Sequence, residues 1–417
     1  MMPFRISGQP LRLLPPLAAV SVLLFSAGCV TFKKPPETDS NNFARVLPAD
    51  YPDFGDLDNR QALVSAARES LEYLDWKNAK NPKTLYTVGD RQITGFMLAD
   101  TIRAFIDVYQ QAATPEDLRR TIAEKFDLYR AIGSDGKGAV TFSAYYEPIY
   151  SASRVKTGDY IYPIYRKPSD LIEVDLERFD ESLKSRKISG RVEDGKLVPY
   201  ADRETIDLGH LLAGKNLEIA WFKSKIEIMD LHIEGSARLN LPDGTQVRAH
   251  YSGTNALEFK GWITTLVKTG VFDKQTVTRE KAEKYLADHP EIKDWILASN
   301  KRYTFFTLDR INDPAQGPSG SIDRPLVAER SIAVDPKYFP LGALVLVQTA
   351  MPELNDRNQL LGYARKTRIV LCQDTGGAIK GPGRVDYFAG TGSKAGTFAS
   401  NMWSTGEVYL PVLKFRP

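Results

Sequence analysis

Cysteine and histidine are scarce in this sequence, and the few present are far apart. Cys29 and Cys372 are the only cysteines among 417 residues, too few for the disulfide framework of a small secreted domain. The histidines show no H-E-x-x-H pair and none stands beside a cysteine; they are His210, His232, His250 and His289. Because metal sites need clustered ligands, we expect neither a metal ion nor another cofactor.

The sequence also has no large excess of positive or negative charge. Lysine and arginine number 55 against 52 aspartates and glutamates, which gives a net charge of +3. Without Arg5 and Arg12, which stand in an N-terminal targeting segment, 53 basic residues face 52 acidic ones, a net charge of +1. This balance offers no electrostatic basis for binding nucleic acid, so we expect no such partner.

The N-terminal segment, residues 1–28, predicts export. The apolar run from Leu13 to Ala27 contains two prolines and is too short for a stable membrane-spanning helix. It ends in Ser26-Ala27-Gly28-Cys29, which resembles the lipobox of bacterial lipoproteins; an ordinary secretory signal is the alternative. The resemblance implies cleavage before Cys29 and acylation of that cysteine. Because Val30 follows rather than aspartate, it also implies the outer membrane, facing the periplasm.

Polar and proline-rich composition predicts a tether over residues 29–53, and helical periodicity begins after it. Leu63, Ala67, Leu71 and Leu74 mark one helix, and Leu98 to Tyr109 repeats the pattern. Short strands with glycine and proline between them dominate from residue 149 onward, typical of a β-barrel rather than a parallel sheet. Among them we expect a strand at Asp230 to Glu234 and a hairpin turn at Leu241 to Gly244.

A glycine-rich stretch near the C-terminus carries two aspartates. An apolar strand, Arg368 to Cys372, leads to Asp374, and seven glycines lie between Gly376 and Gly396, with Asp386 among them. Such glycine density predicts backbone that needs positive φ or close approach. Four interpretations compete: a phosphate-binding loop, an aspartic protease, a carbohydrate-cleaving acid in a groove, and aspartates that only form Asx-turns.

Spacing argues against the first two. The glycines at the end of the stretch have one residue too many for a dinucleotide fingerprint, and no helical pattern follows them. An aspartic protease needs two Asp-Thr/Ser-Gly motifs, whereas Asp374-Thr375-Gly376 has no second copy.

Several motifs resemble those of the membrane-bound lytic murein transglycosylase A family. The matching segments include Tyr145-Tyr146-Glu147-Pro148, Ile233-Glu234-Gly235-Ser236, Tyr251-Ser252-Gly253-Thr254-Asn255, Arg330 to Asp335, Gln373 to Gly381 and Arg384 to Gly390. The resemblance implies a mainly β fold with N-terminal helices, in which a double-psi β-barrel domain holds an inserted, smaller β-barrel domain. The expected boundaries are residues 54–148 for the helices and first part of the main domain, 149–317 for the insert and 318–417 for the rest, a 3D domain.

The implied activity is lytic cleavage of peptidoglycan glycan strands, with a 1,6-anhydromuramoyl product, exolytic action and a role in cell-wall turnover. Asp386 would be the catalytic acid and base, because its apolar neighbours should raise its pKa, and Asp374 would support it. The residues expected to contact substrate are Tyr145, Tyr146, Glu147, Glu234, Ser236, Asn255, Gly376, Gly377, Lys380, Tyr387 and Gly390. A hydrolase using the same groove and a non-catalytic peptidoglycan-binding lipoprotein are the alternatives, and wall-synthesis or wall-remodelling proteins are expected partners.

Overall fold

A computed structural model describes residues 42–183 and 186–414. The predictions for the signal segment, for Cys29 and for the first part of the tether fall on residues 1–41, outside the described residues. In the described part of the chain, no helix combines the length and hydrophobicity needed to cross a bilayer.

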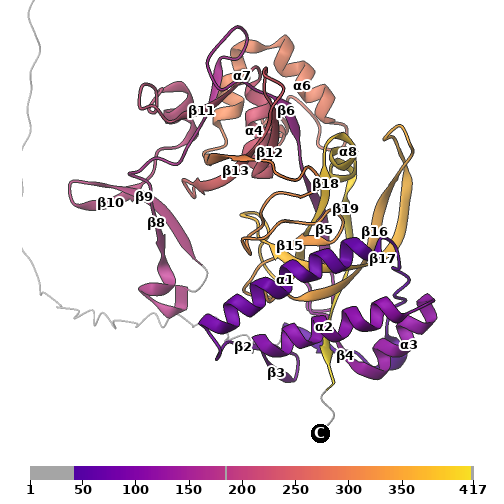
Figure 1. Cartoon of the computed structure of the whole chain (residues 1–417). Coiled ribbons are helices and arrows are strands. Elements are labelled where there is room, and N and C mark those ends of the chain that lie inside the picture. The colour runs from indigo at the N-terminus through magenta and orange to yellow at the C-terminus, as the bar shows by residue number, and fades with distance from the viewer. Residues whose placement is uncertain (1–41, 184–185, 415–417) are drawn as a thin grey trace, which may run out of the picture. The chain divides into compact units, whose positions relative to one another are not determined.

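The central element is a closed six-stranded barrel, in the hydrogen-bonded order β19-β16-β17-β15-β18-β5 with β5 pairing back to β19 (Figure 1). Its sheet continues from β19 to β4 and then β1. The strands of this sheet are β1 (Phe43–Arg45), β4 (Phe126–Ala131), β5 (Val140–Glu147), β15 (Ser331–Ala333), β16 (Leu344–Leu354), β17 (Leu360–Asp374), β18 (Arg384–Thr391) and β19 (Trp403–Leu413). The chain thus builds its barrel from segments on both sides of a long intervening region.

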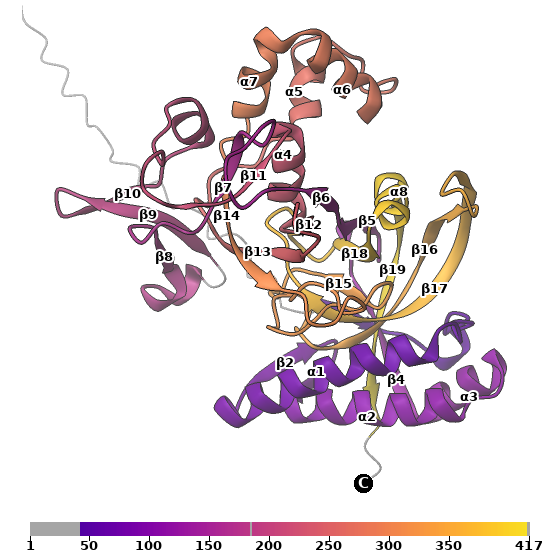
Figure 2. The ribbon, with the colours of Figure 1, turned by 45° about the horizontal axis from the view of Figure 1, so that its top comes forward.

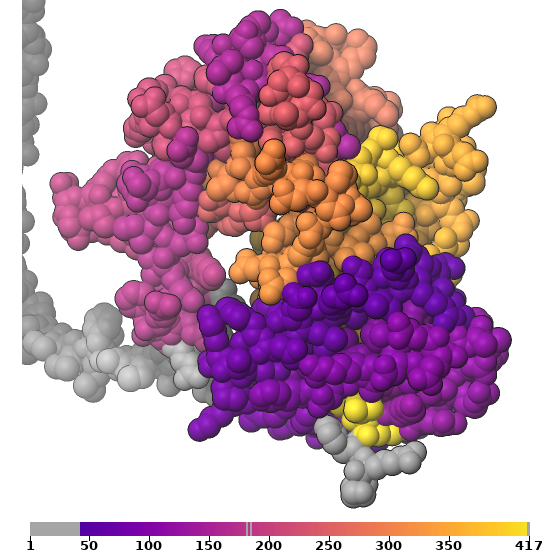
Figure 3. Space-filling view, in the orientation of Figure 1, coloured from indigo at the N-terminus to yellow at the C-terminus, as the bar shows by residue number. Residues whose placement is uncertain are grey.

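The N-terminal helices form a layer under the barrel (Figure 2), seen as a continuous indigo and purple surface in Figure 3. Threonines cap two of these helices, because Thr94 and Thr114 accept from the Met97 and Asp117 amides at 3.2 and 3.1 Å. Buried leucines and aromatics join these helices and the barrel in one core. The layer contains α1 (Arg60–Lys80), α2 (Gly95–Gln111) and α3 (Pro115–Lys125), with the hairpin β2 (Leu85–Val88) and β3 (Arg91–Thr94).

Part of the predicted tether is folded instead. Phe43 and Tyr51 are buried to 1% and 4% exposure, and the Tyr51 hydroxyl donates to the Phe126 carbonyl at 3.1 Å. The 3-10 turn η1 (Pro48–Asp50) lies between them. The tether prediction was therefore wrong from residue 42 to 53, because these aromatic side chains contribute to the main core.

The region between β5 and β15 forms separate sheets: β14-β13-β12-β6, β11-β7 and β10-β9-β8. The predicted hairpin turn is present, since the Gly244 amide donates to the Leu241 carbonyl at 3.0 Å. The double-psi crossing and a second, smaller barrel stay predictions. The strands are β6 (Ile149–Ser151), β7 (Tyr162–Tyr165), β8 (Ile172–Asp175), β9 (Lys187–Glu193), β10 (Lys196–Pro199), β11 (Glu218–Phe222), β12 (Ser236–Asn240), β13 (Gln246–Thr254) and β14 (Thr304–Arg310).

Helices occupy two places where the sequence predicted none. The strand expected at Asp230 to Glu234 is the end of α4 (Lys225–Glu234), which Gly235 terminates with φ 79°. α8 (Ser393–Asn401) follows directly on the C-terminal glycines. The other helices of this half are α5 (Trp262–Lys268), α6 (Arg279–Asp288) and α7 (Pro290–Ala298), with the short turns η2 (Leu176–Arg178), η3 (Glu181–Leu183) and η4 (Glu204–Leu208).

Candidate active site

Strand register brings the two aspartates together on the barrel wall. Asp374 ends β17 and Asp386 lies in β18, and both are paired with Ala333 of the intervening strand β15. On its other side Asp386 is paired with Ser143 of β5. Residues directly opposite each other in a sheet share a face, so the three polar side chains point the same way. Two strand spacings put the aspartate backbones about 10 Å apart.

Asp386 is a part-buried carboxyl with one direct hydrogen-bond partner among the residues that the structure describes. The Ser143 hydroxyl donates to its Oδ1, and Arg384 Nη2 in turn contacts the Ser143 oxygen at 2.6 Å. Burial raises the pKa of Asp386 above its ordinary 3.8, and the negative charge of Asp374 raises it further. The Ser143 hydrogen bond and the Arg384 charge act in the opposite direction, but burial is the largest effect. The carboxyl therefore holds a proton more readily than an exposed aspartate.

Asp374 is surrounded by donors. Tyr145 donates its hydroxyl to Oδ2 at 2.7 Å, and Ser321 donates its amide and hydroxyl to Oδ1 at 3.0 and 2.8 Å. Burial raises the pKa of Asp374, while these hydrogen bonds stabilise its charged form and lower it.

The strand that delivers Asp374 is fastened to the helical layer. Gln373, next to Asp374, is completely buried, and its Nε2 donates to the Ala66 carbonyl at 2.7 Å and to Ser70 Oγ at 3.0 Å. The Ser331 hydroxyl donates to Gln373 Oε1 at 2.6 Å. Because every polar atom of the Gln373 side chain is engaged, Asp374 starts from a fixed backbone position.

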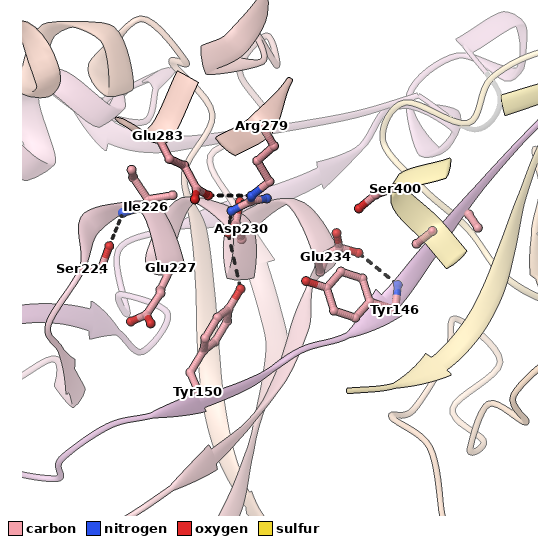
Figure 4. Close-up of a pocket in the computed structure, with 12 residues that line it drawn as sticks. Tyr146, Tyr150, Ser224, Ile226, Glu227, Asp230, Glu234, Arg279, Glu283 and Ser400 are labelled. Atoms are coloured by element: carbon pink, nitrogen blue, oxygen red, sulfur yellow. Dashed lines mark hydrogen bonds and ion pairs between the residues drawn. The ribbon is translucent and has the colours of Figure 1, made fainter. Parts of the chain in front are cut away.

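A pocket of about 480 Å³ opens beside β5, with its wall formed by α4, α6 and α8 (Figure 4). Glu234 and Tyr146 lie side by side in it, and the Tyr146 amide donates to Glu234 Oε2 at 3.2 Å. Burial raises the pKa of Glu234 from 4.5 to about 8, with Asp386 among the charges that add to the rise. Asp230, one turn before Glu234 on α4, is held by Arg279 of α6. Glu234, which is expected near substrate, therefore lies within electrostatic reach of Asp386.

The adjacent tyrosines have different surroundings, as their alternation on a strand predicts. The Tyr145 ring packs on Phe388 with centroids 5.3 Å apart while its hydroxyl reaches Asp374. Tyr146 lines the pocket, where Gly396 of α8 leaves room for its ring: a Cβ there would lie 2.9 Å from Tyr146 Cε2.

Four residues expected to contact substrate are buried structural groups. Glu147 is completely buried, and Arg238 contacts its Oε2 at 2.8 Å while Thr391 donates to the same atom at 2.8 Å. Asn255 is 1% exposed and holds the Ala201 carbonyl at 2.9 Å. Both polar groups thus have buried structural partners, and their contact with substrate stays a prediction.

Tyr387 and Ser236 are the other two. Tyr387 is 1% exposed and donates its hydroxyl to the Glu329 carbonyl at 2.7 Å. Ser236 is 7% exposed at the start of β12. Both side chains are buried, and their contact with substrate stays a prediction.

The remaining predicted contacts lie around the aspartate loop. Lys380 is exposed, and Gly390 has φ 111°. A Cβ on Gly376 would lie 2.7 Å from Ile379 Cγ1, and one on Gly377 would lie 2.1 Å from Arg302 Nη1. Arg302 comes from the region between the two barrel segments, so Gly377 allows that arginine to approach the loop.

Ser143, Ser321 and Arg302 belong to the site but were not predicted. Ser143 precedes the tyrosine pair by two residues on β5, a position that gave no signal by itself. Ser321 contacts Asp374 from a loop 53 residues earlier in the chain. Only the pairing of distant strands and loops reveals these contacts.

Comparison with protein families covers both parts of the described chain. Residues 141–307 match the family model of the MltA specific insert domain, and residues 330–411 match that of the 3D domain. A curated relative, the membrane-bound lytic murein transglycosylase A homolog of Buchnera aphidicola, is 28% identical over 278 residues, 66% of this chain and 67% of its own. The Escherichia coli K12 membrane-bound lytic murein transglycosylase A is 25% identical over 293 residues, 70% of each chain.

Solved structures have the same architecture. A membrane-bound lytic murein transglycosylase from Agrobacterium tumefaciens superimposes with a TM-score of 0.68 at 28% identity, covering 89% of this chain and 98% of that one. MltA from Neisseria gonorrhoeae gives 0.65 at 26% identity, covering 90% and 94%. E. coli MltA with bound chitohexaose gives 0.64 at 21% identity, covering 91% and 96%, a likeness of fold alone.

Proposed function

The chain belongs to the MltA family, and on that premise we propose that it is a peptidoglycan lytic transglycosylase. Its substrate would be the β-1,4 bond between N-acetylmuramic acid and N-acetylglucosamine in peptidoglycan glycan strands. The observation that carries the proposal is Asp386, a part-buried carboxyl with a raised pKa beside a second aspartate on one face of the barrel. Such a group suits proton transfer in both directions.

We assign both proton transfers to Asp386. In the first, its carboxyl proton passes to the glycosidic oxygen as the bond from that oxygen to the muramoyl C1 breaks. In the second, the muramoyl C6 hydroxyl adds to C1 and gives its proton to the Asp386 carboxylate, which restores the acid. The products are a 1,6-anhydromuramoyl end and an N-acetylglucosamine with a free 4-hydroxyl, and no water is consumed.

Asp374 would support this cycle without transferring a proton. Its three hydrogen bonds from Tyr145 and Ser321 stabilise the carboxylate, and a negative charge there favours the positive charge that develops on C1. The same charge raises the pKa of Asp386 and so keeps the acid protonated. Glu234, Tyr146 and the glycine loop supply the surroundings in which the sugar rings would bind.

The products test the reaction. Purified protein should release muropeptides with 1,6-anhydro ends from isolated sacculi in H₂¹⁸O, and mass spectrometry should find no ¹⁸O in them. Reducing ends that carry ¹⁸O would identify a hydrolase instead. Release from labelled strand ends should precede internal cleavage if the action is exolytic, as the family resemblance implies. Absence of any fragments would favour the non-catalytic alternative.

Anchoring forms a separate part of the proposal. We expect Cys29 to be acylated in the outer membrane, which would hold the enzyme at the periplasmic face beside its substrate and its partners in wall remodelling. The Cys29→Ala variant should incorporate no radiolabelled palmitate. It should be absent from the membrane fraction or remain as the uncleaved precursor. If wild-type protein takes up no palmitate and globomycin causes no precursor to accumulate, the lipobox interpretation is wrong.

A further inference from the structure

Asp386 is linked to a cation through a single hydroxyl. Arg384 Nη2 lies 2.6 Å from Ser143 Oγ, and that hydroxyl contacts Asp386 Oδ1. The guanidinium is itself held in place, because Nη1 donates to the Val385 carbonyl at 2.9 Å and its Cζ stands 5.1 Å from the Trp403 ring centroid. Three neighbouring strands, β5, β18 and β19, therefore fix the direction of this chain of hydrogen bonds.

The donor and acceptor roles along the chain follow from chemistry. A guanidinium has only donors, so Ser143 Oγ must accept from Arg384. The hydroxyl has one proton of its own, and within residues 42–183 and 186–414 its only acceptor is Asp386 Oδ1. Oδ1 therefore accepts a hydrogen bond, and because the carbonyl oxygen of a carboxylic acid is its better acceptor, this contact favours the acidic proton on Oδ2.

We propose that Arg384 and Ser143 are positioning residues that place the acidic proton of Asp386 on Oδ2 and keep that oxygen free for the substrate. The inference rests on the proposed function, in which Asp386 is the acid and base. Oδ2 would give its proton to the glycosidic oxygen and then accept the proton of the muramoyl C6 hydroxyl, while Oδ1 stays bound to Ser143 throughout. One oxygen thus performs both transfers, and the carboxyl need not rotate between them.

Other charged and titratable groups also act on Asp386. Asp374 on β17 raises its pKa, and the Arg384 charge on its own strand lowers it. The negative charge of Asp386 in turn raises the pKa of Tyr145 on β5 and of Glu234 on α4. Because the Ser143 hydrogen bond stabilises the ionised form, its removal should leave Asp386 easier to protonate.

The test compares Ser143→Ala, Ser143→Thr and Arg384→Met by two measurements. The first is the titration of Asp386 by carboxyl ¹³C NMR of aspartate-labelled protein, with Asp386→Asn assigning the resonance. The second is the pH profile of kcat/KM for release of anhydro-muropeptides. A hydrogen bond to a charged group is worth about one pH unit or more, so Ser143→Ala should raise the Asp386 midpoint and the alkaline limb by about one unit. Its limiting kcat should fall roughly 10-fold with KM little changed, because Ser143 acts through Asp386.

Ser143→Thr keeps the hydroxyl and should keep both values, while Arg384→Met should raise the midpoint as Ser143→Ala does. Ser404→Ala is the matched control, because Ser404 bonds Thr349 at 2.7 Å in the same barrel and should leave both values unchanged. An unchanged or lowered midpoint in folded Ser143→Ala or Arg384→Met would overturn the inference. If the midpoint rises but wild-type protein releases no anhydro-muropeptides, the roles of Arg384 and Ser143 in positioning Asp386 are supported and the proposed function is wrong.

Discussion

Asp386 and Asp374 differ in what their carboxyls contact, and substitution should separate their roles. Asp386→Asn keeps the shape of the side chain but cannot transfer a proton, so release of anhydro-muropeptides should fall about 10²–10⁴-fold. Thermal stability should stay equal or rise slightly, because burial of this carboxyl opposes its ionisation. The measurements are muropeptide release by chromatography and unfolding temperature by circular dichroism.

Asp374→Asn should affect stability more than catalysis. The Tyr145 and Ser321 donors would lose a charged acceptor, so unfolding temperature should drop, while the rate should fall less than in Asp386→Asn. Near wild-type release by folded Asp386→Asn would move the catalytic assignment to Asp374.

Glu234 makes the stability of the fold depend on pH. Its pKa rises from 4.5 when exposed to about 8 in the folded protein. A raised acid stabilises the fold fully below its unfolded pKa, and this contribution is lost as pH increases from about 4.5 through 8. Glu234→Gln cannot ionise, so between pH 5 and pH 9 it should lose less stability than wild type, by roughly 2 kcal/mol after allowance for partial exposure. Denaturant unfolding at both pH values measures the difference, and equal losses in the two proteins would contradict the assignment.

At the scale of elements, α8 and β5 meet where Gly396 faces the Tyr146 ring. Alanine normally stabilises a helix interior by about 1 kcal/mol relative to glycine. At Gly396 the added Cβ would lie 2.9 and 3.0 Å from Tyr146 ring carbons, so the same substitution should destabilise wild type by about 1 kcal/mol. In a Tyr146→Ala background the contact is gone, and Gly396→Ala should become stabilising.

A double-mutant cycle by denaturant unfolding checks this reversal of sign. Additive effects of Gly396→Ala and Tyr146→Ala would mean that the ring and the helix do not interact. A rise in KM with Gly396→Ala would also link the ring position to substrate binding, because Tyr146 lines the pocket.

Local sequence signals predicted elements well where caps and periodicity agreed. α2 and α3 follow the predicted periodicity and begin at Thr94 and Thr114. α4 was missed although Ser224 caps it and Gly235 ends it. The helix is short, and its residues Asp230 to Glu234 alternate between polar and apolar types, as the residues of a strand do. α8 was missed because its nine residues include glycine, serine, threonine and asparagine, which are poor helix formers, and its packing on β5 and β18 stabilises it instead.

At the scale of the whole molecule, Glu147 joins the barrel to the region that interrupts it. Arg238 and Arg248 of β12 and β13 both contact this buried carboxylate. The same arginines donate to the Pro314 carbonyl at 2.8 Å and to the Gln316 carbonyl at 3.2 and 2.7 Å. The chain leaves the barrel at Glu147 and returns after Gln316, so one ion cluster holds both connections.

Removing the Glu147 charge should therefore be costly. Glu147→Gln leaves two buried guanidiniums without a counter-charge, and the free energy of unfolding should fall by about 3–5 kcal/mol. Glu173→Gln is the control, because Glu173 pairs with Lys167 at 3.0 Å in an exposed position and should cost less than about 1 kcal/mol. Thermal and denaturant unfolding measure both variants. If Glu147→Gln and Glu173→Gln lowered the free energy of unfolding by the same amount, the buried cluster would contribute no more than a surface ion pair.

The sequence revealed the two aspartates because they lie in one glycine-rich stretch. It could not reveal that Ser143, 243 residues from Asp386, is the partner of that carboxyl, because strand register across the barrel determines the contact. Glu147 looked like a groove residue for the same reason, since its arginine partners lie 91 and 101 residues further on. Residue type and local spacing predicted the chemistry, whereas burial depended on distant pairing.

Closure of the barrel by β19 also has a consequence for when the protein folds. Arg130 of β4 pairs with Glu407 of β19 across 277 residues, so β4 and β5 lack this partner until the end of the chain is made. At ordinary synthesis rates that wait lasts roughly 15–55 seconds. Unpaired strand edges are templates for aggregation during such an interval, and long-range pairing folds slowly. The barrel face that carries Ser143 and Asp386 therefore cannot close before the last strand is made.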